Sequence, residues 1–171
     1  MPEAPAGPIR LLFLDVDGTL TDGIIGFVGE RDTRHFWVRD GIALEWARDL
    51  GVTSVVISGR GSSSVQARMD DLKLESYLDI KDKVAVAERV LKRESVTWAE
   101  CAMVGDDLPD VPLMKRVGWP IAVADASAEV IGVARTVTKS AGGHGAVREA
   151  VEAILRHNGR WDEVLRRYQV T

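Results

Sequence analysis

The segment of residues 11–19, LLFLDVDGT, constrains the fold more than any other part of this chain. Its apolar residues 11–14 are too few for an ordinary helix and do not alternate with polar residues, which is typical of a central strand buried on both faces. In parallel sheets covered by helices, ligands bind beyond the carboxyl ends of the strands. Asp15 and Asp17 follow this strand directly, so we expect their carboxylates at the ligand-binding edge of such a sheet.

Two carboxylates so close together repel each other unless a cation or a shared proton lies between them. A hard divalent ion such as Mg²⁺, which binds a few carboxylates together with water and phosphate oxygens, meets that need. The alternative is a strand that ends in an Asx turn, where Asp and Gly are common because of turn geometry alone.

Polar residues also follow two later apolar strands, which we expect over residues 52–57 and 101–104. If all three strands are parallel, these residues lie at the same sheet edge as Asp15. A hydroxyl followed by a glycine and a helix start is suited to a phosphate oxygen, although a serine N-cap without a ligand explains it equally well. Three carboxylates after the later strand exceed what a turn and a cap need. The residues are Ser58, Gly59 and Arg60 after the first of these strands, and Gly105, Asp106, Asp107 and Asp110 after the second.

Strands alternate with helices along the rest of the chain, which predicts an α/β fold: a doubly wound parallel sheet with helices on both faces. We expect a single domain over residues 1–171, with disorder over residues 1–8. Further strands are expected over 77–80, 120–124 and 135–138. Helices are expected over 41–50 with Asp40 as N-cap, and over 65–72, 81–92, 127–133, 146–157 and, as an amphipathic segment, 161–168.

Residues 23–38 predict a β-hairpin that projects after the first strand, with strands over 24–28 and 34–38 around the polar residues 29–32. Phe27, Phe36 and Trp37 give the hairpin a large aromatic surface. Such a surface needs a partner, and composition alone leaves open whether this is the core of the domain or another subunit.

The net charge of −4 and the absence of clusters of Lys and Arg exclude a nucleic acid or an anionic membrane as the expected partner. The single cysteine, Cys101, is expected to be a buried thiol on a strand. The chain shows neither a signal peptide nor an apolar run of membrane-spanning length, so a cytoplasmic enzyme is expected. Lys83 stands in the first turn of a helix, where the dipole disfavours a cation; this hints at a role, although a solvated surface lysine is the simpler interpretation. His144, in the glycine-rich loop 142–145, is kept as a candidate.

The order of these residues resembles the haloacid dehalogenase superfamily of phosphotransferases. Asp15-Val16-Asp17-Gly18-Thr19 is similar to its first motif, Ser58 to its second, Lys83 to its third, and Gly105-Asp106-Asp107 with Asp110 to its fourth. The resemblance implies that Asp15 is a nucleophile that becomes an aspartyl phosphate, and that Asp17 acts as general acid and then as general base. It further implies that Mg²⁺ is held by Asp15, the Asp17 backbone carbonyl and Asp106, that Asp107 and Asp110 steady the site, and that Ser58 and Lys83 bind phosphoryl oxygens.

A closer resemblance, covering residues 9–159, is to the capless subgroup that acts on 3-deoxy-D-manno-octulosonate 8-phosphate (KDO 8-phosphate). It rests on segments such as Val38-Arg39-Asp40-Gly41 and the run from Gly142 to Glu149. It implies a homotetramer in which hairpins meet and the tail of a neighbour covers the site, because too few residues separate the first two motifs for a cap domain. The substrate-binding residues it suggests are Thr19, Gly59, Arg60, Arg68, His144 and Arg148, with Arg60 and Arg68 able to pair with the carboxylate of an acid sugar.

The chain departs from the pattern of this subgroup at Ala43, where a glycine is usual, and before Lys83, where another glycine is missing. These changes concern the substrate-facing rim more than the catalytic centre. The alternatives are therefore a phosphatase of another small ester, such as a nonulosonate 9-phosphate, or a non-catalytic scaffold partner of a sugar-nucleotide enzyme. A phosphomutase would require a cap to protect the phosphoryl group from water.

Overall fold

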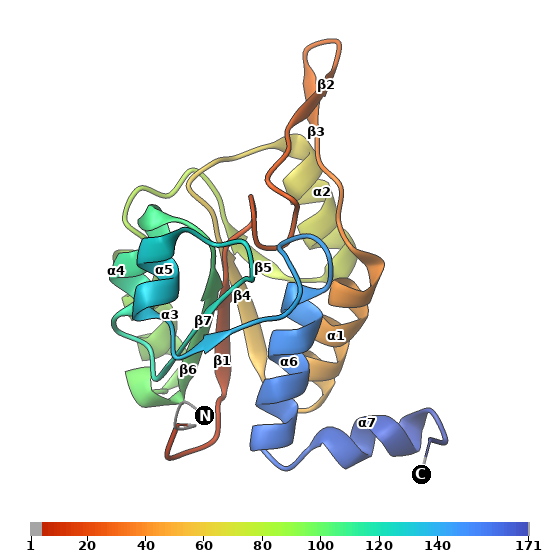
Figure 1. Cartoon of the computed structure of the whole chain (residues 1–171), viewed down its shortest axis with the longest axis vertical. Coiled ribbons are helices and arrows are strands. Elements are labelled where there is room, and N and C mark those ends of the chain that lie inside the picture. Colours follow the sequence, from red (N-terminus) through yellow and green to blue (C-terminus); the bar gives the residue numbers. More distant parts are fainter. Residues whose placement is uncertain (1–4, 171) are drawn as a thin grey trace.

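The computed structural model describes residues 5–170 and confirms the doubly wound parallel sheet. Six strands lie in the order β5-β4-β1-β6-β7-β8, and every neighbouring pair is parallel. Helices cover both faces of this sheet, and a two-stranded hairpin projects from one end of the molecule (Figure 1). No cap domain is present among residues 5–170.

The elements follow one another in the order β1 (Leu11–Leu14), β2 (Gly26–Val28), β3 (Arg31–Thr33), α1 (Val38–Asp49), β4 (Thr53–Ile57), α2 (Ser63–Leu72), β5 (Glu75–Tyr77), α3 (Lys83–Glu94), η1 (Trp98–Glu100), β6 (Cys101–Gly105), η2 (Leu108–Asp110), α4 (Val111–Met114), β7 (Trp119–Ala122), α5 (Ala128–Val133), β8 (Thr136–Val137), α6 (Ala146–His157) and α7 (Trp161–Arg167), where η1 and η2 are short 3-10 helices.

Strand β1 lies at the centre of the sheet, and alternate residues of it enter two separate cores. Leu12 and Leu14 pack with α1, α2 and α6 on one face, whereas Leu11 and Phe13 pack with α3, α4 and α5 on the other. All four side chains are fully buried, which explains why the strand lacks polar alternation. Leu14 pairs with Val56 of β4 and with Val104 of β6, so the carboxyl ends of these three strands are level.

The hairpin is present, but its second strand differs from the predicted one. Strands β2 and β3 pair antiparallel across a two-residue turn at Gly29 and Glu30, and Gly29 adopts a φ of 62° that favours glycine. This tight turn makes Arg31–Thr33 the pairing strand, so the expectation of a strand over residues 34–38 is wrong. Arg34 instead leaves the hairpin and turns into the molecule, where its side chain is buried.

The predicted N-cap of the first helix is also wrong, because Asp40 lies inside α1 and caps a different helix. Trp37 is the N-cap residue of α1, and Asp40 is buried in its first turn. The Asp40 Oδ1 atom accepts a hydrogen bond of 2.7 Å from the backbone N–H of Arg148, in the first turn of α6. Since the N-cap residue of α6 is Gly145, which has no side chain, a carboxylate from α1 satisfies this helix end.

Several predicted boundaries shift for local reasons. Strand β5 ends at Tyr77 rather than at residue 80, because Asp79 has a left-handed backbone with a φ of 58°. Helix α6 has the predicted bounds, whereas the short helix α4 was not predicted. The expected disorder over 1–8 falls partly outside the described residues, which begin at 5. Gly7 has a defined place, since its carbonyl oxygen accepts a hydrogen bond of 2.9 Å from His157 Nε2.

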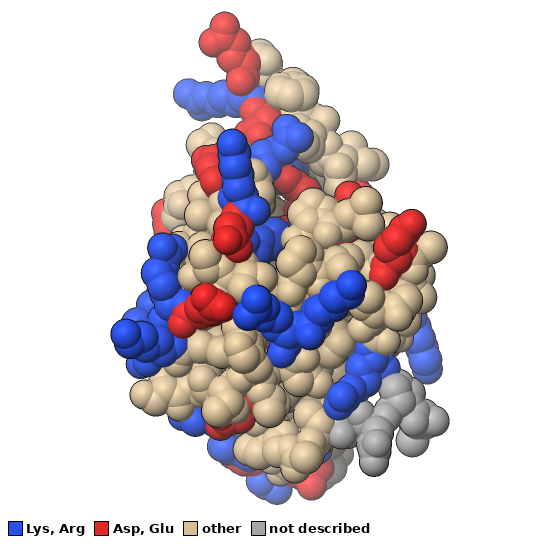
Figure 2. All heavy atoms as spheres, turned by 90° about the vertical axis from the view of Figure 1, so that its left-hand side faces the viewer, with Lys and Arg blue, Asp and Glu red and all other residues tan. Residues whose placement is uncertain are grey.

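The face formed by α3, α4 and α5 carries basic and acidic side chains that are interspersed over apolar and neutral surface (Figure 2). No helix within residues 5–170 combines the length and the hydropathy needed to cross a bilayer.

Candidate active site

A cavity of about 350 Å³ lies at the carboxyl ends of β1, β4 and β6. The level strand ends bring together residues that are far apart in the sequence, as expected from the parallel register. The residues that line this cavity are Asp15, Asp17, Ser58, Gly59, Arg60, Lys83, Asp106, Asp107, Pro109 and Asp110.

Lys83 lies between two buried carboxylates at the base of the cavity. It is the first residue of α3, whose N-cap Asp82 accepts the backbone N–H of Ala85 at 3.0 Å. Its Nζ atom donates to Asp15 Oδ1 and, at 2.7 Å, to Asp110 Oδ1. Burial would lower the pKa of Lys83, but the two carboxylates outweigh it and hold this pKa above its ordinary value. Lys83 is therefore a buried ammonium rather than a solvated surface lysine.

The carboxylates at the strand ends carry more negative charge than Lys83 neutralises. Burial, together with the charge of Asp110, raises the pKa of Asp15 despite the contact with Lys83. Burial and the charge of Asp15 raise the pKa of Asp106. Carboxylate oxygens of Asp15, Asp106 and Asp110 all lie within 4.8 Å of one another. This partly buried set of hard oxygen donors fits a divalent cation such as Mg²⁺, whose charge would relieve the repulsion.

Asp110 and Thr19 orient the other groups of this cluster. Asp110 Oδ2 accepts the backbone N–H groups of Asp106 at 3.1 Å and Asp107 at 3.4 Å, while its other oxygen binds Lys83. Thr19 is fully buried and its Oγ1 donates to Asp106 Oδ1 at 2.9 Å. Thr19 therefore contacts a candidate metal ligand.

The turn after β1 has the tightest packing in the site. Gly18 has a φ of 94°, and a Cβ atom on it would lie 2.2 Å from Asp106 Oδ2. The loop of residues 142–145 packs closely against this turn. A Cβ on Gly142 would lie 1.8 Å from the carbonyl oxygen of Gly18. Glycine at these positions lets the 142–145 loop buttress the loop that carries Asp17.

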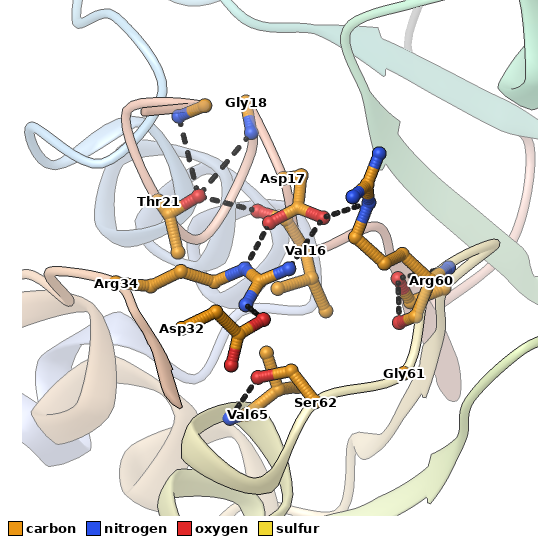
Figure 3. A network of polar contacts seen from close by, with 12 residues as sticks. Val16, Asp17, Gly18, Thr21, Asp32, Arg34, Arg60, Gly61, Ser62 and Val65 are labelled. Atoms are coloured by element: carbon orange, nitrogen blue, oxygen red, sulfur yellow. Dashed lines mark hydrogen bonds and ion pairs between the residues drawn. The ribbon is translucent and has the colours of Figure 1, made fainter. Parts of the chain in front are cut away.

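Asp17 is held by an arginine that was not predicted from the sequence. Arg34 Nε lies 2.5 Å from Asp17 Oδ1, and Arg34 Nη2 lies 3.3 Å from Asp17 Oδ2 (Figure 3). Arg34 Nη1 donates to Asp32 Oδ2 at 2.6 Å. The only local signal was that Asp32 and Arg34 stand two residues apart, which is the spacing of one strand face. Nothing in the sequence linked Arg34 to Asp17.

Ser58 and Arg60 stand at the end of β4, as predicted. Ser58 is buried, and its Oγ donates to the carbonyl oxygen of Arg60 at 3.0 Å and accepts the backbone N–H of the same residue at 3.2 Å. The Arg60 side chain is 64% exposed, and its Nε lies 4.0 Å from Asp17 Oδ2. A cationic group thus stands at the open rim of the cavity.

Four of the expected substrate-binding residues do not line this cavity, and one of them, Thr19, is fully buried. Arg68 pairs with Asp71 at 2.6 Å, and its guanidinium lies 6.0 Å from the centre of the Phe36 ring. His144 and Arg148 line another cavity, of about 220 Å³, together with Trp37. A larger cavity of about 480 Å³ lies between α1, α6 and α7; its lining is mainly apolar and aromatic and does not include the carboxylates at the strand ends.

The chain is similar in sequence to known phosphatases. Residues 79–150 match the model of the haloacid dehalogenase-like hydrolases. The chain is 40% identical, over 163 residues, to the 3-deoxy-D-manno-octulosonate 8-phosphate phosphatase KdsC of Escherichia coli strain K12. The aligned residues cover 94% of this chain and 86% of KdsC. This coverage extends beyond the resemblance over residues 9–159 that the sequence suggested.

Two solved structures are also similar. One is the 3-deoxy-D-manno-octulosonate 8-phosphate phosphatase from Moraxella catarrhalis in complex with magnesium ion, phosphate ion and KDO, with a TM-score of 0.90, 32% identity, and coverage of 94% of this chain and 93% of that one. The other is the cobalt-bound phosphatase YrbI from Haemophilus influenzae, with a TM-score of 0.86, 33% identity, and coverage of 90% and 91%.

Proposed function

Because the chain belongs to the haloacid dehalogenase-like hydrolases, within the group of KDO 8-phosphate phosphatases, we propose that it is a Mg²⁺-dependent phosphatase that converts KDO 8-phosphate to KDO and inorganic phosphate. The observation that carries the proposal is the buried cluster of Asp15, Lys83 and Asp106 at the strand ends, with Asp17 beside it. A scaffold protein has no need of such a cluster, because burying several carboxylates around one lysine costs stability.

Asp15 is the nucleophile in this proposal. One of its carboxylate oxygens attacks the phosphorus atom of the ester, and the bond between phosphorus and the sugar oxygen breaks. Asp17 gives its proton to the departing sugar oxygen, so that an alcohol rather than an alkoxide leaves. The product of this step is an aspartyl phosphate on Asp15.

Water completes the reaction. Asp17, now ionised, takes a proton from a water molecule as the oxygen of that water attacks phosphorus, and the bond to Asp15 breaks. Inorganic phosphate leaves, and both aspartates return to their starting state. Lys83 and Ser58 stand beside Asp15 in the cavity and are placed to bind phosphoryl oxygens through both steps.

We assign Mg²⁺ to Asp15, Asp106 and the backbone carbonyl of Asp17. Both oxygens of Asp110 already accept hydrogen bonds, from Lys83 and from two backbone N–H groups, so its part is to orient rather than to bind the ion. When bound, Mg²⁺ supplies positive charge that offsets the repulsion between an anionic nucleophile and an anionic substrate. Thr19 and Asp107 support this arrangement.

The sugar acid is expected to enter from the rim that holds Gly59 and Arg60. The exposed guanidinium of Arg60 can donate two parallel hydrogen bonds to the carboxylate of the substrate. The name of the Moraxella relative, solved with magnesium, phosphate and KDO, supports a sugar acid as substrate. A phosphorylated sugar acid is too highly charged to cross a bilayer unaided, so the enzyme must act in the compartment where this substrate is formed, which we propose is the cytoplasm.

We also propose that the protein assembles as a tetramer through its hairpins. Ile24, Phe27 and Val28 are 69%, 71% and 71% exposed in the single chain, and Trp37 and Val38 at the start of α1 are exposed as well. So much exposed apolar area on a projecting element is typical of a protein interface (Figure 1). The tail of a neighbouring subunit could then cover the open cavity. It could also contact His144, Arg148 or Arg68, which lie outside the cavity of the single chain.

The test is phosphate release from a panel of sugar phosphates, with Mg²⁺ and with a chelator. The panel includes KDO 8-phosphate, a nonulosonate 9-phosphate and simple hexose phosphates. We expect Mg²⁺-dependent turnover with the highest kcat/KM on KDO 8-phosphate. Preference for another ester would overturn the assigned substrate, and no turnover on any member would support the scaffold alternative.

A further inference from the structure

Arg34 uses both edges of its guanidinium group on carboxylates. The edge formed by Nε and Nη2 contacts both oxygens of Asp17, and Nη1 contacts Asp32 on the hairpin. The Arg34 side chain is completely shielded from solvent, whereas the side chains of Asp17 and Asp32 are 23% and 21% exposed. Hydrogen bonds with Asp17, followed by those with Asp32, hold the pKa of Arg34 above its ordinary value despite its burial. Arg34 is thus a fixed cation.

The other cation beside Asp17 cannot fix its orientation. Arg60 lies on the opposite side of the carboxylate, at 4.0 Å and with 64% of its side chain exposed (Figure 3). Such an exposed contact is weak and mobile compared with a buried two-point contact. The direction in which the Asp17 carboxylate points is therefore set mainly by Arg34.

We infer that Arg34 is a positioning residue for proton transfer by Asp17, and that it ties this aspartate to the base of the hairpin. The inference rests on the proposed function, in which Asp17 serves as acid and base. A displacement of about 1 Å of such a group costs roughly a hundredfold in rate. Asp15, Lys83 and Asp106 do not contact Arg34, so loss of Arg34 should leave the attack on phosphorus largely intact.

The choice of ester separates a positioning role from a purely structural one. Departure of a sugar oxygen requires a proton from Asp17, because an alkoxide is a poor leaving group. Departure of p-nitrophenolate requires none. For an aryl ester, the only step that still needs Asp17 is the attack of water on the aspartyl phosphate, which follows release of the phenolate.

The test compares Arg34→Gln with wild type on p-nitrophenyl phosphate and on KDO 8-phosphate, or on whichever alkyl phosphate wild type turns over best. We expect kcat/KM to fall about a hundredfold on the alkyl ester and less than about fivefold on the aryl ester. With the aryl ester, the variant should show a burst of p-nitrophenolate close to one per active site, because hydrolysis of the phosphoenzyme becomes limiting.

Further variants serve as controls. Arg34→Lys keeps the charge but cannot contact both oxygens of Asp17 and also Asp32, so an intermediate effect with the same preference for the aryl ester is expected. It gives the same comparison if Arg34→Gln does not fold. Arg89→Gln, at an exposed arginine of α3 and outside the hairpin, should behave as wild type. In an Asp17→Asn background, Arg34→Gln should add less than about a threefold further loss on the alkyl ester.

An equal fall on both esters, or no fall on either, would overturn the role of Arg34, as would full additivity with Asp17→Asn. Wild type that hydrolyses p-nitrophenyl phosphate but not KDO 8-phosphate would contradict the assigned substrate and leave the Arg34 comparison intact. Absence of hydrolysis of any ester by wild type would contradict the proposed function itself and, with it, this inference.

Discussion

Asp15 is buried and is also the nucleophile of the proposed mechanism. Replacing one of its carboxylate oxygens by an amide nitrogen tests these two properties separately. Burial raises the pKa of Asp15, which means that the folded chain is less stable with this carboxylate ionised than with it neutral. Lys83 and a bound cation offset this cost. The residue is therefore retained for chemistry and not for stability.

Asp15→Asn should lower phosphate release at least about a thousandfold, because an amide cannot form the aspartyl phosphate. The free energy of unfolding without metal should not fall at neutral pH, since the variant buries one charge fewer. Phosphate release and urea unfolding measure the two effects. Asp162→Asn, at an exposed site on α7, serves as the matched control and should keep full activity. Substantial hydrolysis by Asp15→Asn would mean that another group is the nucleophile.

Asp40 should make the free energy of unfolding depend on pH. The residue is 1% exposed, and burial raises its pKa to about 6, although N–H groups of Arg148 and Gly145 lower it in part. The folded chain therefore keeps a proton that the unfolded chain, with an ordinary carboxyl pKa, has already released. The stability that this proton contributes is lost as the pH rises through about 6.

Asp40→Asn keeps an acceptor for the N–H of Arg148 but cannot ionise. Between about pH 5 and about pH 7.5, wild type should lose about 1 kcal/mol of unfolding free energy relative to this variant. Urea unfolding of both proteins at the two pH values measures the difference, in which the shifts of the other carboxylates cancel. A difference that stays constant with pH would show that Asp40 titrates normally in the folded state.

The sequence predicted those site residues that directly follow strands. It did not predict residues that come together only through the tertiary structure. Asp15, Ser58 and Asp106 each follow an apolar run, so parallel pairing was enough to bring them to one edge. Arg34 follows a hairpin whose orientation depends on how its base packs. Its contact with Asp17 therefore could not be predicted from spacing.

Among the elements, the loop of residues 142–145 and the turn after β1 depend on each other. Gly142 donates its N–H to Asp125 Oδ1 at 2.9 Å, and Gly143 donates to the carbonyl oxygen of Thr19 at 3.0 Å. These contacts tie the segment before α6 to the loop that carries Asp17. A rigid element behind a catalytic loop keeps its side chains in register with the strands.

Gly142→Ala should destabilise the fold by about 1 to 3 kcal/mol and lower kcat at least about tenfold, because the new Cβ would overlap the carbonyl oxygen of Gly18. Thermal unfolding and the phosphatase assay report the two effects. Gly132→Ala is the control: that glycine lies in α5 with open space around it, so stability should stay unchanged or rise. Equal behaviour of the two variants would refute the buttressing role of the loop.

Elements with a regular apolar pattern were predicted better than those fixed by tertiary contacts. Helix α6 has six buried apolar residues at helical spacing, and its predicted and observed bounds agree. The beginning of α1 was misplaced because Asp40 resembles an N-cap in sequence. In the structure it serves a helix more than a hundred residues later, a contact that no local pattern encodes.

At the scale of the whole molecule, the hairpin is the element that the single chain does not explain. The hairpin projects from one end of the molecule (Figure 1), and its exposed apolar residues Ile24, Phe27 and Val28 belong to neither core. Assembly through the hairpins would cover them and would bring other chains towards the open cavity. Because Arg34 joins the hairpin to Asp17, assembly and catalysis would also be coupled.

Phe27→Ser combined with Val28→Ser should convert the tetramer to smaller species and leave the free energy of unfolding of the chain within about 0.5 kcal/mol, because both side chains are exposed in the monomer. Analytical ultracentrifugation measures the change. Ile131→Ser, at an exposed position of α5 on another surface, is the control and should not alter assembly. A wild-type protein that sediments as a stable monomer would rule out the tetramer.

The central claim is that hydrolysis passes through a phosphoryl group on Asp15. Enzyme mixed with KDO 8-phosphate and Mg²⁺, quenched in acid within one turnover and digested, can be analysed by peptide mass spectrometry after reduction with borohydride, which converts an aspartyl phosphate to homoserine. We predict homoserine at position 15 only, and only when substrate was present. Continued turnover with position 15 unmodified under conditions that trap acyl phosphates, or modification at another carboxylate, would contradict the account.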